Sequence, residues 1–276
     1  MKKYEMYDLK KASYIKIGCK AKNFIEVYNE DDLKEAVSMN NPKILGGMSN
    51  VLFAGDSYEN TFISLQGEFK EIERISDTDV RAGAGVMLSS LLSFLAENGL
   101  SGLEELSGIP GSLGGMLFMN AGANGVSISD LLVSFDTLEN KNLKKDECVF
   151  SYRHSSIKEP VEFVTLRLKK DSKENIKNKM SDIINKRKMT QPYDTLSLGC
   201  VFKNPAFEIP AWKLIDSVGM RSKCVNDVCV SEKHSNFIIN KGDGKASDFL
   251  SLSEEIVKLV WENYNVKLEY EIEILF

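Results

Sequence analysis

The spacing of apolar and polar residues predicts a mixed chain of short strands and separate helices. Strands are expected at residues 24–28, 43–46, 62–65, 131–138, 148–152, 161–168, 228–230 and 237–240, with two short extended segments within residues 69–84. Helices are expected at residues 31–39, 89–98, 173–189, 211–218 and 247–263. In the last helix, Phe249, Leu252 and Ile256 share one side, which is the pattern of a helix packed on a core.

Three stretches depart from this simple pattern. Residues 108–125 contain so many glycines that we expect no regular structure there. Residues 267–276 alternate between apolar side chains and Glu269, Glu271 and Glu273, which predicts one long strand. The helix at residues 173–189 is polar on all sides, so we interpret it as a crossing from a cofactor-binding region to a C-terminal cap.

Composition narrows the class of protein. The chain has 276 residues, 43% of them hydrophobic and 27% charged, and this length predicts two or three globular domains. A net charge of −5 argues against nucleic acid as a partner. The basic run at residues 169–188 is interleaved with acidic side chains and is interpreted as a solvated helix face. Since neither a signal peptide nor a membrane span is evident, we expect a cytoplasmic protein without a membrane partner.

Five cysteines occur, and their odd number and irregular spacing predict reduced thiols rather than a disulfide framework. Cys224, Cys229 and His234 lie close together in sequence, but their spacing matches no common zinc pattern, so no metal is expected. His154 is next to Arg153 and could act as a base or could equally be a structural neighbour of the arginine.

Two glycine loops are candidates for holding a pyrophosphate. Gly46 and Gly47 follow an expected strand and precede Met48, Ser49 and Asn50. Paired glycines allow a sharp turn that brings main-chain N–H groups close to an anion, although a plain turn is the alternative. A second loop, residues 108–115, has four glycines and a proline, and an Asn-Ala-Gly segment follows at 120–122. Neither loop matches a P-loop, and residues 83–85 lack the third glycine of a Rossmann turn.

Three side chains could carry chemistry. Arg153 follows a strand and could pair with a carboxylate or phosphate, or could simply lie on the surface. Cys200, between Gly199 and an apolar pair, could be a buried structural thiol or a general acid, because an unperturbed thiol stays protonated at neutral pH. Glu271 could be a solvated strand carboxylate or a member of the same site.

Taken together, these segments resemble the UDP-N-acetylenolpyruvoylglucosamine reductase family over almost the whole chain, from about residue 14 to residue 274. The resemblance rests on seven segments in order: residues 45–52, 107–115, 120–123, 152–155, 199–205, 230–237 and 268–271. About 45 residues separate Arg153 from Cys200, as in the shorter type of the family that lacks an inserted loop bearing a tyrosine.

The resemblance implies an α+β fold with a two-part FAD-binding domain of the vanillyl-alcohol-oxidase type and a C-terminal substrate domain. The implied boundaries are 1–68 for the first FAD subdomain, completed by a strand at 267–276, then 69–172 for the second, 173–190 for the connecting helix and 191–266 for the substrate domain. The implied FAD contacts are Gly46, Gly47, Met48, Ser49, Asn50, Val51, Gly108, Ile109, Pro110, Gly111, Gly114, Asn120, Ala121, Gly122 and Arg153. Tyr152, Lys203 and Asn204 are implied to contact substrate.

The implied reaction is the NADPH-dependent, FAD-mediated reduction of the enolpyruvyl double bond of UDP-N-acetylglucosamine enolpyruvate, in peptidoglycan precursor synthesis. FAD would be bound without a covalent link, and the protein would be a monomer or weak dimer. Arg153 would stabilise developing charge, Cys200 would donate a proton, and Glu271 would hydrogen-bond the same region.

Three positions differ from the family pattern. Cys200 stands where serine is frequent, Asn124 where an aromatic is common, and Glu273 where some members have arginine. Two other functions are conceivable on the same fold: an alcohol or lactone oxidase with covalently bound flavin, and a non-catalytic sensor of a UDP-sugar. The joint presence of Arg153, Cys200 and Glu271 favours the reductase over the sensor, because a sensor needs no acid.

Overall fold

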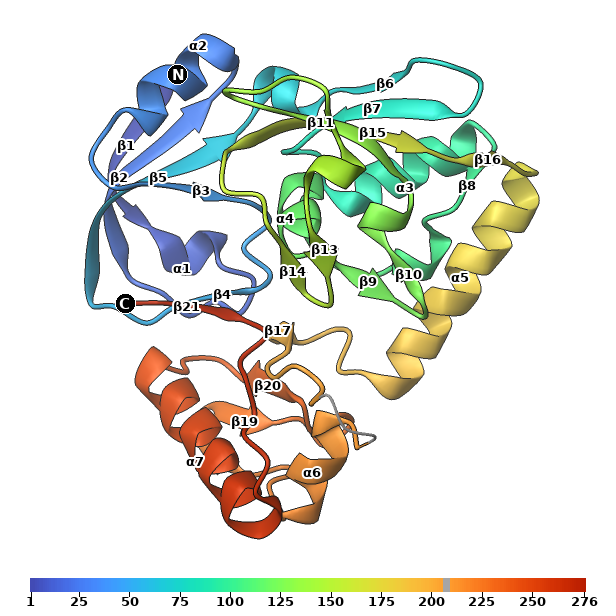
Figure 1. Ribbon diagram of the computed structural model, residues 1–276. Helices are drawn as coiled ribbons and strands as arrows, with labels where there is room; N and C mark the ends of the chain where they lie inside the picture. Colours follow the sequence, from blue (N-terminus) through green and yellow to red (C-terminus); the bar gives the residue numbers. More distant parts are fainter. Residues whose placement is uncertain (206–208) are drawn as a thin grey trace. The chain divides into compact units, whose positions relative to one another are not determined.

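The computed structural model describes residues 1–205 and 209–276 (Figure 1). Its helices are α1 (Leu9–Ala12), α2 (Glu30–Val37), α3 (Leu88–Glu97), α4 (Leu113–Phe118), α5 (Lys173–Thr190), α6 (Ala211–Ser217) and α7 (Ala246–Tyr264). Its strands are β1 (Lys2–Asp8), β2 (Lys20–Val27), β3 (Pro42–Leu45), β4 (Val51–Phe53), β5 (Ser57–Leu65), β6 (Ile72–Arg74), β7 (Asp79–Gly83), β8 (Leu100–Ser101), β9 (Gly122–Ala123), β10 (Val126–Ser127), β11 (Leu132–Thr137), β12 (Leu143–Lys144), β13 (Phe150–Ser151), β14 (His154–Ser155), β15 (Val161–Arg167), β16 (Lys169–Lys170), β17 (Leu196–Cys200), β18 (Cys224–Val225), β19 (Val228–Val230), β20 (Phe237–Asn240) and β21 (Glu273–Leu275).

The chain forms two compact units. The first comprises Met1–Glu5, Asn23–Gly47 and Glu59–Lys186, and the second comprises Met6–Lys22, Met48–Tyr58 and Arg187–Phe276. Each unit therefore draws on separate stretches of the chain. The domain boundaries predicted from sequence stay a prediction.

In the first unit, a five-stranded antiparallel sheet has the order β12-β11-β15-β7-β6. Helix α4 packs against β7 and β15 of this sheet. Val161, Val164 and Leu166 of β15 are buried in the large apolar core of this unit. Helix α3 lies in the same core and ends as predicted, because Gly99 takes the left-handed conformation with φ of 64°.

A second sheet has the order β1-β2-β5-β3, and β3 runs parallel to β5. Helix α2 precedes β3, and its Asn29 cap accepts a hydrogen bond from Asp32 N at 2.9 Å. Leu33 and Ala36 form the buried face of α2, as its apolar spacing predicts. The strand β3 then leads directly into the first glycine loop.

The second unit contains a four-stranded antiparallel sheet in the order β17-β20-β19-β18. Helix α7, red in Figure 1, packs against β18 and β19 with Phe249, Leu252 and Ile256 buried, which confirms the predicted amphipathic face. Helix α6 packs against α7. The final strand β21 is not part of this sheet and pairs in parallel with β4.

Two secondary-structure predictions are wrong. Within the glycine-rich residues 108–125, Leu113–Phe118 form helix α4, because Ser112 caps the helix and Leu113, Met116 and Leu117 anchor it in the core. The long strand expected at residues 267–276 is divided. Residues 273–275 pair with β4, whereas residues 269–271 hydrogen-bond residues 201–203 instead.

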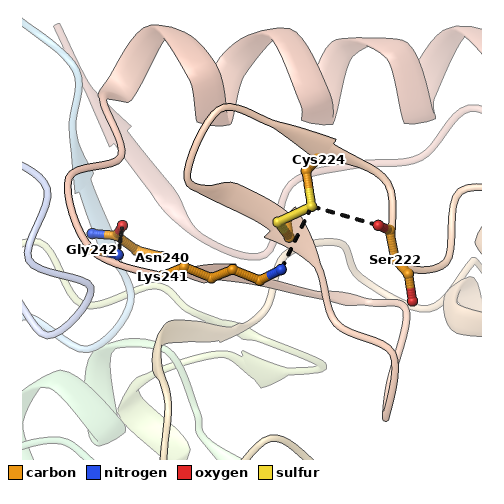
Figure 2. The surroundings of a disulfide bond; sticks show 6 residues. Ser222, Cys224, Asn240, Lys241 and Gly242 are labelled. Atoms are coloured by element: carbon orange, nitrogen blue, oxygen red, sulfur yellow. Dashed lines mark hydrogen bonds between the residues drawn. A yellow bond between two sulfur atoms is a disulfide. The ribbon is translucent and has the colours of Figure 1, made fainter.

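The prediction of reduced thiols is wrong for one pair, because Cys224 and Cys229 form a disulfide (Figure 2). Asn226 and Asp227 form the turn between β18 and β19, and this turn places the two cysteines opposite each other in the register. The sulfur of exposed Cys224 also lies 3.8 Å from Lys241 Nζ and 3.5 Å from Ser222 O. Cys19, Cys148 and Cys200 are outside any disulfide.

Within the described ranges, no helix combines the length and apolar character that a bilayer-spanning segment needs.

Candidate active site

The two predicted glycine loops lie against each other in the first unit. A Cβ atom added to Gly46 would lie 2.5 Å from Ser112 Oγ, and one added to Gly47 would lie 2.9 Å from Gly111 Cα. Glycine is therefore required at Gly47 by the backbone of the second loop, whereas a side chain at Gly46 would displace Ser112 Oγ from its bond with Gly115 N. The sequence shows two separate glycine loops, and the fold brings Gly46 and Gly47 against Gly111 and Ser112.

The second loop is fixed to the segment that precedes α3. Leu113 N donates to Val86 O and Gly114 N donates to Ala84 O, both at 2.8 Å. A Cβ on Gly114 would lie 2.8 Å from Ala84 Cβ, whereas Gly115 is exposed. The N–H groups of Leu113 and Gly114 are thus engaged within the protein, and the glycines at the start of α4 permit close approach of a neighbouring group because they carry no side chain.

Arg153 lies at the tip of the β13–β14 hairpin, and this hairpin is attached to the chain that follows α4. Asn120 Nδ2 donates to Ser151 O at 2.9 Å, and Ser155 Oγ donates to Phe118 O at 2.7 Å. Arg153 Nη1 donates to Gly122 O at 3.0 Å. These bonds bring the predicted residues Asn120, Gly122 and Arg153 together.

Several predicted site residues have an uncommon backbone conformation. Met48, Asn120 and Arg153 have φ values of 49°, 43° and 55°, which residues other than glycine adopt rarely. Such conformations cost about 1–3 kcal/mol each and are concentrated at ligand sites. At Arg153 the conformation belongs to the two-residue turn of the β13–β14 hairpin, and other non-glycine residues adopt it in ordinary turns, such as Asn226 between β18 and β19.

The residues of the first unit fit a flavin dinucleotide. Asn120 Oδ1 is buried and has no hydrogen-bond partner in the described part of the chain, although buried polar atoms are ordinarily paired. Met87, Phe118 and Tyr152 are exposed although they are large and apolar. A group with a polar dinucleotide portion and an aromatic ring system would satisfy both features.

In the second unit, hydrogen bonds of the backbone and of the Asn50 side chain bring together the segments that contain Cys200, Glu271 and Asn50. The β17–β20 register shifts between Ser197 and Cys200, where Gly199 has φ of 78°. After Cys200 the chain turns to a new partner, and Glu271 N donates to Val201 O at 2.8 Å. Asn50 Nδ2 donates to Glu271 O at 3.0 Å, so Asn50 fixes the extended segment that carries Glu271.

The three residues predicted to contact substrate each interact with another residue of the protein. Lys203 Nζ lies 3.5 Å from Glu269 Oε2 at a partly exposed position. Asn204 Oδ1 accepts a hydrogen bond from Ala211 N at 3.1 Å, at the first residue of α6. Both residues therefore help to hold the segment after Cys200. Tyr152 is exposed, and the Arg153 guanidinium lies 5.1 Å from its ring centroid.

The histidines have different surroundings. His154 is exposed in β14. His234 is partly buried, with its ring centroid 4.9 Å from that of Phe237 and 6.2 Å from that of Trp212. Burial lowers the pKa of His234, although a hydrogen bond of its own backbone and the charge of Asp216 oppose this shift.

One buried residue beside Cys200 was not predicted. Asn236 lies within the segment at 230–237 that carries the family resemblance, but the sequence pattern predicts no role for it. Its side chain bonds both main-chain polar groups of Phe202, at 3.0 Å and 2.7 Å. The only sequence signal is its place directly before the strand expected at residues 237–240.

Comparison with known proteins identifies both parts of the chain. Residues 21–141 match an FAD binding domain, and residues 191–275 match the UDP-N-acetylenolpyruvoylglucosamine reductase C-terminal domain. The prediction of an α+β fold with an FAD-binding domain and a C-terminal domain is thus confirmed, as is the prediction of FAD as cofactor.

Relatives extend this similarity over nearly the full length. The UDP-N-acetylenolpyruvoylglucosamine reductase of Carboxydothermus hydrogenoformans is 36% identical over 272 residues, covering 94% of this chain and 89% of that protein. The reductase of Rickettsia massiliae is 34% identical, covering 96% and 93%. The crystal structure of the Thermus caldophilus reductase has a TM-score of 0.87 at 32% identity, covering 100% of this chain and 98% of that one. The chain therefore belongs to the UDP-N-acetylenolpyruvoylglucosamine reductase family and is a flavin-dependent oxidoreductase.

Proposed function

We propose that this protein catalyses the NADPH-dependent, FAD-mediated reduction of UDP-N-acetylglucosamine enolpyruvate to UDP-N-acetylmuramate, a step of peptidoglycan precursor synthesis. The observation that carries the proposal is the direct pairing of residues 201–203, which follow Cys200, with residues 269–271. A potential proton donor and a carboxylate on paired neighbouring segments suit the protonation of a carbanion. The names of the relatives supply the substrate class.

The cofactor contacts follow from the two glycine loops and their neighbours. We assign to FAD Gly46, Gly47, Met48, Ser49, Asn50, Val51, Gly108, Ile109, Pro110, Gly111, Gly114, Asn120, Ala121, Gly122 and Arg153. When bound, FAD supplies the hydride that it has accepted from NADPH. The glycines let the main chain of the two loops approach the pyrophosphate closely, and Asn120 Oδ1 offers an acceptor.

The substrate requires an acid and a positive charge. Its double bond is conjugated to a carboxylate, so hydride addition at the methylene carbon places negative charge on the neighbouring carbon and the carboxylate. In the proposed mechanism, Arg153 stabilises that charge, which is worth several kcal/mol, about 3–4 for one donor at a comparable site. Cys200 donates its thiol proton to the carbanion, and Glu271 hydrogen-bonds the same region.

Tyr152, Lys203 and Asn204 are the proposed contacts for the rest of the substrate. The Lys203 ammonium already has an acidic neighbour in Glu269, and both side chains are accessible to solvent. An exposed pair of this kind contributes little to stability, so the lysine can exchange its partner for a diphosphate at small cost. We further propose a cytoplasmic location and a monomeric or weakly dimeric state.

The test is a product assay with purified, FAD-loaded protein. NADPH oxidation should depend on added UDP-N-acetylglucosamine enolpyruvate, and mass spectrometry should find a product heavier by two hydrogen atoms. NADPH oxidation that needs only oxygen would contradict the proposal. Acid precipitation separates the rival oxidase, because a covalently bound flavin would stay with the pellet, whereas the proposed cofactor should appear in the supernatant.

A further inference from the structure

Asn236 makes three hydrogen bonds to the two residues that follow Cys200. Its Oδ1 accepts from Phe202 N at 3.0 Å, and its Nδ2 donates to Phe202 O at 2.7 Å. Its main-chain oxygen accepts from Val201 N at 2.8 Å. The Asn236 residue is only 3% exposed, and both side-chain bonds are buried. The side chain thus substitutes for a neighbouring strand at this point.

Such a substitute is needed because the regular ladder is interrupted beside Cys200. The register of β17 on β20 shifts between Ser197 and Cys200, and Gly199 is in the left-handed region. A main-chain segment that leaves a ladder inside a protein must find other partners for its N–H and C=O groups. Asn236 supplies both partners for Phe202.

The same segment also determines where Glu271 lies. Glu271 N donates to Val201 O at 2.8 Å, and Lys203 N donates to Glu269 O at 2.9 Å. The rings of Phe202 and Tyr270 are 5.1 Å apart between centroids. Asn236 therefore holds the backbone that connects the proposed proton donor to the proposed carboxylate.

We propose that Asn236 is a positioning residue that fixes the Cys200 thiol relative to Glu271 by bonding both main-chain polar groups of Phe202. This inference rests on the function proposed above. Asn236 touches neither substrate nor flavin in this account. It acts only through the backbone of residues 201–202.

Asn240 provides a matched control four residues further along. It is buried to a similar degree, at 4% exposure, and its side chain makes three hydrogen bonds, against two for the side chain of Asn236. Its Nδ2 donates to Ile15 O, and its Oδ1 accepts from Gly242 N and Gly244 N, each at 3.0 Å. None of these bonds reaches residues 200–203. Asn236→Asp and Asn240→Asp are therefore the same chemical change at equal burial, with only the first next to the thiol.

The first readout separates the two halves of the reaction. In FAD-loaded Asn236→Asp, reduction of the flavin by NADPH should keep its wild-type rate, whereas anaerobic reoxidation by enolpyruvyl UDP-sugar should slow by about 10- to 100-fold. In Asn240→Asp both rates should stay within about twofold of wild type at a temperature where the protein is folded. If flavin reoxidation slowed equally in the two variants, the role of Asn236 would be purely structural, and the proposal would be overturned.

The second readout does not depend on the proposed function. Alkylation of Cys200 by iodoacetamide is followed by peptide mass spectrometry, with Cys148 of the first unit as an internal reference. The ratio of the two rates should change severalfold in Asn236→Asp and stay constant in Asn240→Asp. An unchanged ratio in both variants would overturn the proposal.

Asn236→Ser, which retains a smaller polar group, repeats both measurements if the aspartate variant does not fold. Failure of the wild-type protein to be reoxidised by the enolpyruvyl UDP-sugar would instead contradict the proposed function. In that event the alkylation ratio still decides whether Asn236 positions the thiol.

Discussion

Gly114 and Gly115 are neighbours in α4, and the structure predicts opposite consequences for replacing each of them with alanine. A Cβ on Gly114 would lie 2.8 Å from Ala84 Cβ and 3.1 Å from Ala84 O, which cannot move without shifting the backbone. A Cβ on Gly115 would meet only Ser112 Oγ, at an ordinary contact distance of 3.4 Å. Both changes give α4 the same gain in helix propensity.

The magnitudes follow from these two terms. Replacing a helical glycine with alanine stabilises by about 0.5–1 kcal/mol, and this applies to both variants. Overpacking against a fixed neighbour costs about 1–3 kcal/mol, and this applies to Gly114→Ala alone. The propensity term cancels in the comparison, so Gly114→Ala should be less stable than Gly115→Ala by about 1–3 kcal/mol. For a folded unit of about 150–250 residues, this corresponds to a difference in Tm of about 2–12 °C.

The assay is thermal unfolding of both variants and wild type, first without FAD and then at saturating FAD. In the flavin-free protein, Gly115→Ala should melt at or above the wild-type temperature and Gly114→Ala below it. Equal melting temperatures for the two alanine variants would refute the close packing of α4 on residues 84–86. A loss of the FAD-induced stabilisation in Gly115→Ala alone would show that the flavin approaches this exposed glycine.

The remaining predictions concern the second unit. Cys200→Ala should allow NADPH to bleach the flavin but slow its reoxidation by substrate about 10²- to 10⁴-fold, whereas Cys200→Ser should keep much of the activity; wild-type reoxidation in the alanine variant would exclude the thiol as the acid. Reduction of the Cys224–Cys229 disulfide, which closes a short loop, should lower the free energy of unfolding by about 2 kcal/mol, and a doubly serine-substituted variant should not respond to reductant. Burial lowers the folded-state pKa of His234 below its unfolded value of about 6.5, so its contribution to stability is present above that pH and is lost as pH falls through the folded-state pKa. Urea unfolding from pH 7 to pH 5 should therefore show a smaller decline for His234→Gln than for wild type, and equal declines would contradict this assignment.

Sequence predicted most of the helices because their apolar spacing reports directly on which face is buried. Helix α7 and the glycine stop of α3 are examples. Helix α4 was not predicted, because two of its six residues are glycines. It is stabilised by the Ser112 cap and by packing on the sheet. Local composition argued against a helix, and tertiary contacts decided the outcome.

The candidate site shows a similar limit. The separate segments with Arg153, Cys200 and Glu271 could be read from motifs, but their hydrogen-bonded partners could not. Asn236 illustrates this, because its bonds to Phe202 depend on a register shift that no local pattern encodes. The disulfide was missed for a different reason. The two-residue turn at Asn226 and Asp227 places the cysteines opposite each other, whereas the odd total of cysteines and their irregular spacing predict free thiols.

The most direct test of whether the reduced flavin reduces UDP-N-acetylglucosamine enolpyruvate is made without oxygen. The flavin of the purified protein is reduced with NADPH, excess reductant is removed, and UDP-N-acetylglucosamine enolpyruvate is added while the flavin absorbance is followed. We predict rapid return of the yellow colour together with formation of UDP-N-acetylmuramate. A flavin that stays bleached until air is admitted would contradict the assignment of this substrate and favour an oxidase.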